Sequence, residues 1–201
     1  MKIKICGLKQ ARDVEFANIV KPDYIGFVFA LKKRKISFEQ AASLKKLLSK
    51  DIGAVGVFID EPAENIIKLL NDGVIDIAQL HGNETEEDIQ YIKAVTGKKV
   101  IKAVRVHEKA DVEAWLDSSA DYLLFDSGAG SGEVFDWRLL DGIDRDFFLA
   151  GGLNADNLSE VVRHIKPYAV DLSSGVETDG VKDFERMKQV VEIVRTIYER
   201  K

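Results

Sequence analysis

The chain has 201 residues, of which 46% are hydrophobic and 31% charged, and it carries a formal net charge of −5. These values are typical of a folded globular protein, and we expect residues 1–201 to form a single domain with a sizeable core. The negative charge argues against nucleic acid or an acidic membrane as the main partner, because both favour a basic protein surface.

Short apolar runs rich in Ile, Val, Phe and Tyr recur along the chain and predict strands. They lie at 2–6, 23–29, 53–58, 74–80, 99–104, 121–126, 146–150 and 168–173. Most segments between them carry apolar residues at the spacing of helices that pack on a sheet, and the weakest of these segments, 136–142, is expected to form a short helix. Ser37 and Asn154 are placed to cap the helices that follow them.

This alternation of strands and helices predicts a parallel sheet, and about eight such units predict an α/β fold, a single-domain (β/α)8 TIM barrel with short loops. An open, doubly wound sheet is the alternative architecture. Its dinucleotide site has no support, because the first strand-helix junction reads CGLK rather than G-x-G-x-x-G. We therefore favour the barrel.

Cys6 is the only cysteine, and it ends the first predicted strand, where such barrels place active-site residues. Side chains alternate along a strand, so Lys4 and Cys6 should point into the barrel while Ile3 and Ile5 face the helices. A lone cysteine is often an inert buried hydrophobe. Lys4 lies one layer below and would favour the thiolate, which makes Cys6 a candidate general base or nucleophile.

Asp126 ends the sixth predicted strand, with Tyr122 and Leu124 on the same face. As a turn residue, Asp126 would hydrogen-bond the backbone that follows it. Alternatively, a carboxyl group in an apolar pocket keeps its proton to a higher pH than in water and can donate it near neutrality. Cys6 and Asp126 are therefore a candidate pair of base and acid.

Glycine-containing stretches follow three late strands, GAGSG at 128–132, AGGLN at 150–154 and DLSSGVE at 171–177. The last two are the loops after strands seven and eight, where TIM barrels frequently bind phosphate through backbone N–H groups. Glycine also serves ordinary turns. Two such loops at consecutive strand ends nevertheless predict the phosphate of a sugar or nucleotide as part of the ligand.

These residues resemble one family, the phosphoribosylanthranilate isomerases of tryptophan biosynthesis. The matching motifs occur in order: KICGL at 4–8, DYIGFVF at 23–29, GVF at 56–58, QLHG at 79–82, IKAV at 101–104, FDS at 125–127, GSGEVFDW at 130–137, LAGGLNADNL at 149–158 and VDLSSGVE at 170–177. The resemblance implies a cofactor-free Amadori rearrangement of N-(5-phosphoribosyl)anthranilate. In that reaction Asp126 would protonate the furanose ring oxygen, and Cys6 would remove the proton from C2′.

The resemblance also implies substrate-binding residues and no metal. Arg34, in the basic stretch 31–37, matches the arginine that holds the anthranilate carboxylate, a role suited to a planar guanidinium. Gln79 and His81 would line the aromatic pocket, although a histidine is also a rival base. The phosphate would be bound by residues of three loops, Gly130, Gly132, Gly151, Gly152, Ser173, Ser174 and Gly175.

Two loops depart from the family's usual pattern. The stretch 31–37 lacks the common proline and has lysines before its arginine, and the short loop 127–134 has Ala129 where glycine is usual. Substrate affinity is the property that these departures would change.

Lys4 and Asp171 should both point inward from the first and eighth strands, which are neighbours in a closed barrel. A charge buried there is tolerated when it is paired. We therefore expect a Lys4–Asp171 ion pair, or the pairing of Lys4 with another inward carboxylate.

Two other functions remain open. One is another phosphate-binding barrel, such as indole-glycerol-phosphate synthase or a histidine-pathway isomerase with two catalytic aspartates, although those isomerases would carry an aspartate where this chain has Cys6. The other is a binding protein that has lost its chemistry, which would need neither Cys6 nor Asp126.

The expected setting is the cytoplasm, and the expected partner is a small-molecule substrate. No apolar run reaches the roughly 18 residues that a membrane-spanning helix needs, and we expect no signal peptide, because the first residues lack its apolar middle and cleavage site. A single cysteine excludes an internal disulfide. Both a monomer and a homodimer are compatible with this fold.

Overall fold

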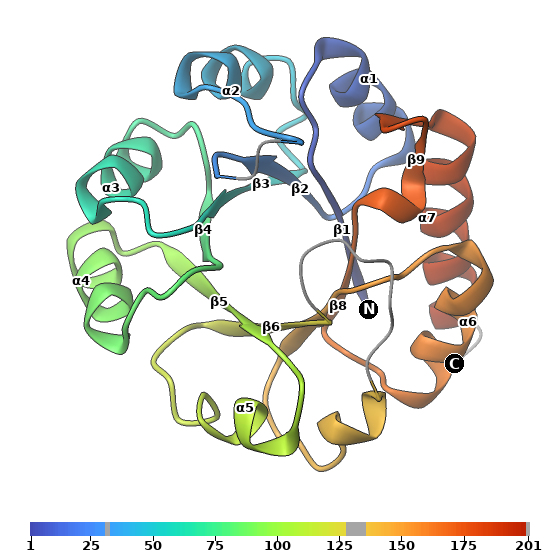
Figure 1. Cartoon of the computed structure of the whole chain (residues 1–201). Helices are drawn as coiled ribbons and strands as arrows, with labels where there is room; N and C mark the ends of the chain where they lie inside the picture. Colours follow the sequence, from blue (N-terminus) through green and yellow to red (C-terminus); the bar gives the residue numbers. More distant parts are fainter. Residues whose placement is uncertain (31–32, 128–135, 200–201) are drawn as a thin grey trace.

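A computed structural model describes residues 1–30, 33–127 and 136–199 of the chain (Figure 1). Eight parallel strands pair in chain order and close into a barrel, with β1 next to both β2 and β8. The predicted TIM barrel is confirmed. The strands are β1 Lys2–Cys6, β2 Tyr24–Val28, β3 Gly53–Phe58, β4 Ile77–Leu80, β5 Lys99–Arg105, β6 Tyr122–Asp126, β7 Phe147–Leu149 and β8 Ala169–Leu172.

Helices form a ring around the strands (Figure 1). They are α1 Ala11–Val20, α2 Phe38–Lys45, α3 Ala63–Asn71, α4 Glu86–Thr96, α5 Lys109–Glu113, α6 Ala155–His164 and α7 Phe184–Glu199. The short helix expected at 136–142 is the 3₁₀ helix η1, Trp137–Leu140. Across the described ranges, no helix combines the length and the apolar character that a membrane span requires.

The segment between β8 and α7 has a structure that strand and helix periodicity did not predict. It contains the 3₁₀ helix η2, Ser174–Val176, and a two-stranded antiparallel hairpin of β9, Glu177–Thr178, and β10, Val181–Lys182. In the antiparallel register of this hairpin, Glu177 and Lys182 lie opposite each other.

The predicted caps are confirmed. The Ser37 hydroxyl accepts a hydrogen bond from the backbone N–H of Gln40 at 3.2 Å, and the Asn154 side chain accepts from the N–H groups of Asp156 and Asn157 at 2.8 and 3.3 Å. These side chains satisfy N–H groups that have no partner within a helix. The caps therefore fix where α2 and α6 begin after their loops.

The two faces of β1 are divided as alternation predicts. Ile3 and Ile5 are fully buried in the core between strands and helices, whereas Lys4 and Cys6 face the barrel interior. A second core fills the interior below the strand ends. It comprises Val55, Ile77, Ile101, Ala103, Tyr122, Leu124, Phe148, Ala150 and Ala169.

Aromatic rings fill the barrel at the N-terminal ends of the strands. The hydroxyl groups of Tyr24 and Tyr168 are 2.9 Å apart, and Lys99 Nζ donates to the Tyr122 hydroxyl at 2.7 Å. Phe148 packs against all three tyrosine rings. This packing leaves the C-terminal ends of the strands as the place for a functional site.

Candidate active site

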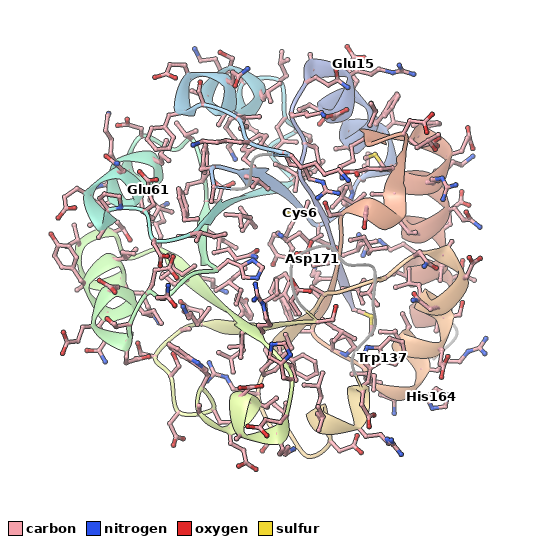
Figure 2. All side chains as sticks on the ribbon, viewed as in Figure 1. Cys6, Glu15, Glu61, Trp137, His164 and Asp171 are labelled. Carbon is pink, nitrogen blue, oxygen red and sulfur yellow. The ribbon has the colours of Figure 1, made fainter. Side chains whose placement is uncertain are left out.

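A cavity at the C-terminal ends of the strands brings together residues from distant parts of the chain. Side chains point into the barrel there, and Figure 2 shows Cys6 and Asp171 near its centre, whereas the labelled Glu15, Glu61 and His164 lie on the outer ring. The predicted residues that line this cavity are Cys6, Arg34, Gln79, His81, Asp126, Gly151, Gly152, Ser173 and Ser174.

Of the predicted phosphate residues that the structure describes, Gly175 alone does not line this cavity. Gly130 and Gly132 lie outside the described residues. Gly175 lines a neighbouring hollow together with Gly152 and Ser174, and a side chain at Gly175 would overlap the carbonyl oxygen of Leu153. Glycine at 175 thus allows the loops after β7 and β8 to approach each other closely.

Cys6 is buried at the end of β1, directly above an ion pair. Lys4 Nζ donates to Asp171 Oδ2 at 2.7 Å, and Lys4 is fully buried. The expected Lys4–Asp171 pair is therefore confirmed. Burial lowers the pKa of Lys4, but Asp171 and Cys6 together raise the pKa of Lys4 above its usual value, so its ammonium stays charged.

The charge of Lys4 acts on the thiol above it. Burial raises the pKa of Cys6 above its usual 9.0, and Lys4 opposes this shift without cancelling it. The thiol therefore predominates at neutral pH, and the thiolate that forms from it is a stronger base than that of an exposed cysteine. Glycine at Gly26 in β2 leaves room for the sulfur, because a side chain there would collide with Cys6 Sγ at 2.5 Å.

Asp126 lies across the cavity from β1, beside His81. The His81 Nε2 and Asp126 Oδ2 atoms are 3.6 Å apart, which is too long for a hydrogen bond. Burial lowers the pKa of His81 below its usual 6.5, despite the opposing charge of Asp126. His81 is thus neutral at pH 7 and a weaker base than an exposed histidine.

Besides the hydroxyl group of Ser127, two acceptors in the cavity wall have no partner within the part of the chain that the structure describes. They are Gln79 Oε1 and Asp171 Oδ1, each on a side chain that is at least nine-tenths buried. A buried acceptor without a partner costs free energy. A bound molecule with hydroxyl or amine donors would satisfy both atoms.

Arg34 reaches the cavity from the loop after β2. Its Nε and Nη2 atoms donate to the two carboxylate oxygens of Glu177, both at 2.8 Å. Gly7 has a φ of +87°, and a side chain there would overlap Arg34 Cδ, so the glycine lets the arginine cross the first loop. Sequence reasoning did not single out Glu177, although it is the last residue of the VDLSSGVE motif.

The loops after β7 and β8 form one wall of the cavity. Gly151 and Gly152 both have positive φ, of +91° and +64°, which exposes backbone along the loop. The Ser173 hydroxyl donates to the carbonyl oxygen of Cys6 at 3.0 Å and so fixes this wall to β1. Gly151 in turn passes so close to Ser127 that a side chain there would overlap it.

Comparison with known proteins agrees with this geometry. Residues 3–193 match the family model described as N-(5'phosphoribosyl)anthranilate (PRA) isomerase. The chain is 50% identical over 201 residues to N-(5'-phosphoribosyl)anthranilate isomerase of Endomicrobium trichonymphae, covering 98% of this chain and 99% of that protein.

Two solved structures are also similar along nearly their whole length. Phosphoribosyl anthranilate isomerase from Thermus thermophilus superposes with a TM-score of 0.89 at 34% identity, covering 98% of this chain and 100% of that chain. A phosphoribosyl anthranilate isomerase in complex with reduced 1-(o-carboxyphenylamino)-1-deoxyribulose 5-phosphate superposes with a TM-score of 0.87 at 34% identity, covering 98% and 99%.

Proposed function

Because the chain belongs to the N-(5'-phosphoribosyl)anthranilate isomerase family, we propose that it isomerises N-(5′-phosphoribosyl)anthranilate to 1-(2-carboxyphenylamino)-1-deoxyribulose 5-phosphate. The observation that carries the proposal is that Cys6, ending β1, and Asp126, ending β6, line one cavity. A reaction that protonates one atom and deprotonates another can use two such groups on the same cavity, one as the acid and the other as the base.

The proposed reaction assigns its first two proton transfers to residues of this cavity. Asp126 donates a proton to the furanose ring oxygen while the nitrogen lone pair forms a C=N bond at C1′ and the bond from C1′ to the ring oxygen breaks. Cys6, as thiolate, then removes the proton from C2′, and the electrons of that C–H bond give the enol-amine. The enol-amine becomes the ketose by taking up a proton at C1′ while the C2′ hydroxyl group loses one, so no oxidant or cofactor is needed.

The environment of Cys6 supports its role as the base. The Lys4 ammonium below it favours the thiolate, whereas burial favours the thiol. Asp171 holds Lys4 at 2.7 Å and so keeps a positive charge beneath the sulfur. Among the groups on this cavity, His81 is the rival base, and its lowered pKa makes it the weaker one.

The substrate would lie across the cavity with its two anionic ends apart. Arg34 would take the anthranilate carboxylate, and Gln79 and His81 would lie beside the aromatic ring and the sugar. The unpartnered Gln79 Oε1 and Asp171 Oδ1 atoms suit donors on the substrate, such as sugar hydroxyl groups. The phosphate would lie on the last loops, at Gly151, Gly152, Ser173, Ser174 and Gly175, with Gly130 and Gly132 adding to the site.

The test is turnover by the wild-type protein. N-(5′-phosphoribosyl)anthranilate is generated in situ from anthranilate, and its fluorescence is followed as it is consumed. Rapid turnover of this substrate would support the proposal, provided that the protein does not turn over the aminoaldose substrate of histidine synthesis. Preference for that second substrate would favour the other phosphate-binding barrels. Tight binding of reduced 1-(o-carboxyphenylamino)-1-deoxyribulose 5-phosphate, the reduced product analogue, without turnover of the substrate would favour a binding protein.

A further inference from the structure

A buried ion network contacts Arg34, and its other two members, Glu177 and Lys182, are not among the residues that line the cavity. Glu177 accepts two hydrogen bonds from Arg34 and a third from Lys182 Nζ, whose distance to Glu177 Oε1 is 2.8 Å. The exposed fractions of the three side chains are 15% for Arg34, 6% for Glu177 and 1% for Lys182. Such an arrangement fixes the orientation of the guanidinium.

We propose that Glu177 and Lys182 are positioning residues that present the free edge of Arg34 to the carboxylate of the anthranilate moiety. This inference rests on the proposed function. A guanidinium has five N–H groups in a fixed plane. Glu177 takes one from Nε and one from Nη2, which leaves the edge formed by Nη1 and Nη2 for a second carboxylate. A two-pronged bond to that edge requires the guanidinium to be held in one orientation.

Lys182 connects the Arg34–Glu177 pair to the rest of the site. Its ammonium donates to Glu177 and to the carbonyl oxygen of Ser173, at 2.8 and 2.9 Å. Ser173 in turn donates through its hydroxyl to the carbonyl oxygen of Cys6 at 3.0 Å. One chain of hydrogen bonds thus runs from the arginine, through the loop after β8, to the strand end that carries the proposed base.

The network of Arg34, Glu177 and Lys182 has a net charge of one positive unit. Arg34 and Lys182 are cations and Glu177 is the only anion among the three. Burial raises the pKa of Glu177, but the hydrogen bonds from Arg34 and Lys182 outweigh this and lower it to about 2, so the carboxylate is ionised at neutral pH. Burial lowers the pKa of Lys182, and Glu177 opposes that shift. An uncompensated cation in a mostly buried wall favours an anionic ligand.

The test uses the substitution Glu177→Gln and two ligands. One ligand is the reduced product analogue, and the other is the same molecule without its ring carboxylate. The substitution raises the positive charge near the ligand by one unit, so simple charge attraction predicts tighter binding of the carboxylated analogue. Loss of positioning predicts the opposite, a Kd for that analogue raised on the order of tenfold. The loss of a hydrogen bond to a charged group typically weakens binding by about that factor.

Three measurements separate positioning from a general structural defect. The Kd of the analogue without the carboxylate should stay within about twofold of wild type. KM should rise by a factor similar to the rise in the Kd of the carboxylated analogue. The value of kcat should change little, because the carboxylate lies away from the reacting atoms. In an Arg34→Met background, Glu177→Gln should have no further effect on the preference for the carboxylated ligand.

Two further variants keep the test decisive. Glu177→Asp retains the charge with a shorter reach and should give an intermediate loss, even if Glu177→Gln does not fold. Asp72→Asn, which breaks an exposed ion pair with Lys68 on α3, should leave both ligands unaffected.

The outcomes also separate this inference from the proposed function. If wild type binds the carboxylated analogue and Glu177→Gln binds it equally well or better, the positioning role is wrong and the proposed function stands. If wild type binds neither ligand, the proposed function is wrong, and the role of Glu177 is overturned with it.

Discussion

The substitution Lys4→Met should strongly destabilise the protein. Lys4 is fully buried, Asp171 is 9% exposed, and their charged atoms are 2.7 Å apart. Methionine keeps most of the volume of the lysine stem, so the main loss is the charge. The second oxygen of Asp171 already has no partner among the described residues. Removing Lys4 would therefore leave a buried carboxylate without compensation.

The expected loss is large because one member of a buried ion pair remains. Breaking such a pair typically costs about 3 to 5 kcal/mol in the free energy of unfolding. For a chain of this size, that loss corresponds to a fall in Tm of about 6 to 20 °C.

The assay is urea unfolding followed by circular dichroism, with thermal unfolding as a second measure. Lys68→Met is the matched control, because Lys68 and Asp72 form an exposed pair, and its effect should stay within about 1 kcal/mol. The double substitution Lys4→Met, Asp171→Leu should recover most of the loss, since both charges are then absent. A loss below about 1 kcal/mol for Lys4→Met, or no recovery in the double variant, would refute the reasoning.

Three other predictions follow from the site and the helix ends. Because burial raises the pKa of Cys6 above 9.0, the rate at which iodoacetamide alkylates Cys6 should still rise between pH 8 and pH 10, and a rate that levels off below pH 8 would contradict the raised pKa. Gly175→Ala should lower stability by about 1 to 3 kcal/mol in urea unfolding, because the added carbon overlaps the Leu153 carbonyl, and an unchanged midpoint would contradict that close approach. Asn154→Ala should cost about 1 kcal/mol by the same measurement, since two N–H groups at the start of α6 lose their acceptor, and a Ser at this position should restore most of it.

The barrel and the inner face of β1 were predictable because they depend on local periodicity. Alternation placed Lys4 and Cys6 inward, and barrel closure made β1 and β8 neighbours, with Lys4 opposite Asp171 in the register. Those two facts were sufficient to predict the ion pair. The caps at Ser37 and Asn154 were predictable for the same reason, since each acts on residues two or three positions away.

The Arg34–Glu177–Lys182 network was not predicted, because nothing local indicates it. The strands β9 and β10 have two residues each, too few for periodicity to detect, and their hairpin alone sets Glu177 beside Lys182. The pairing with Arg34 joins residues 143 positions apart. A charged residue at the end of a site motif, with an opposite charge five positions later, is the one signal that the sequence contained.

The central claim is that Cys6 and Asp126 are the base and the acid of the isomerisation. It is tested most directly by kcat for Cys6→Ser and Asp126→Asn, measured beside the Kd of the reduced product analogue for each variant. The account predicts that kcat falls at least about 100-fold in each variant while the analogue still binds, because general acid–base catalysis contributes at least that factor. A variant that binds the analogue and keeps kcat within about tenfold of wild type would contradict the role assigned to its residue.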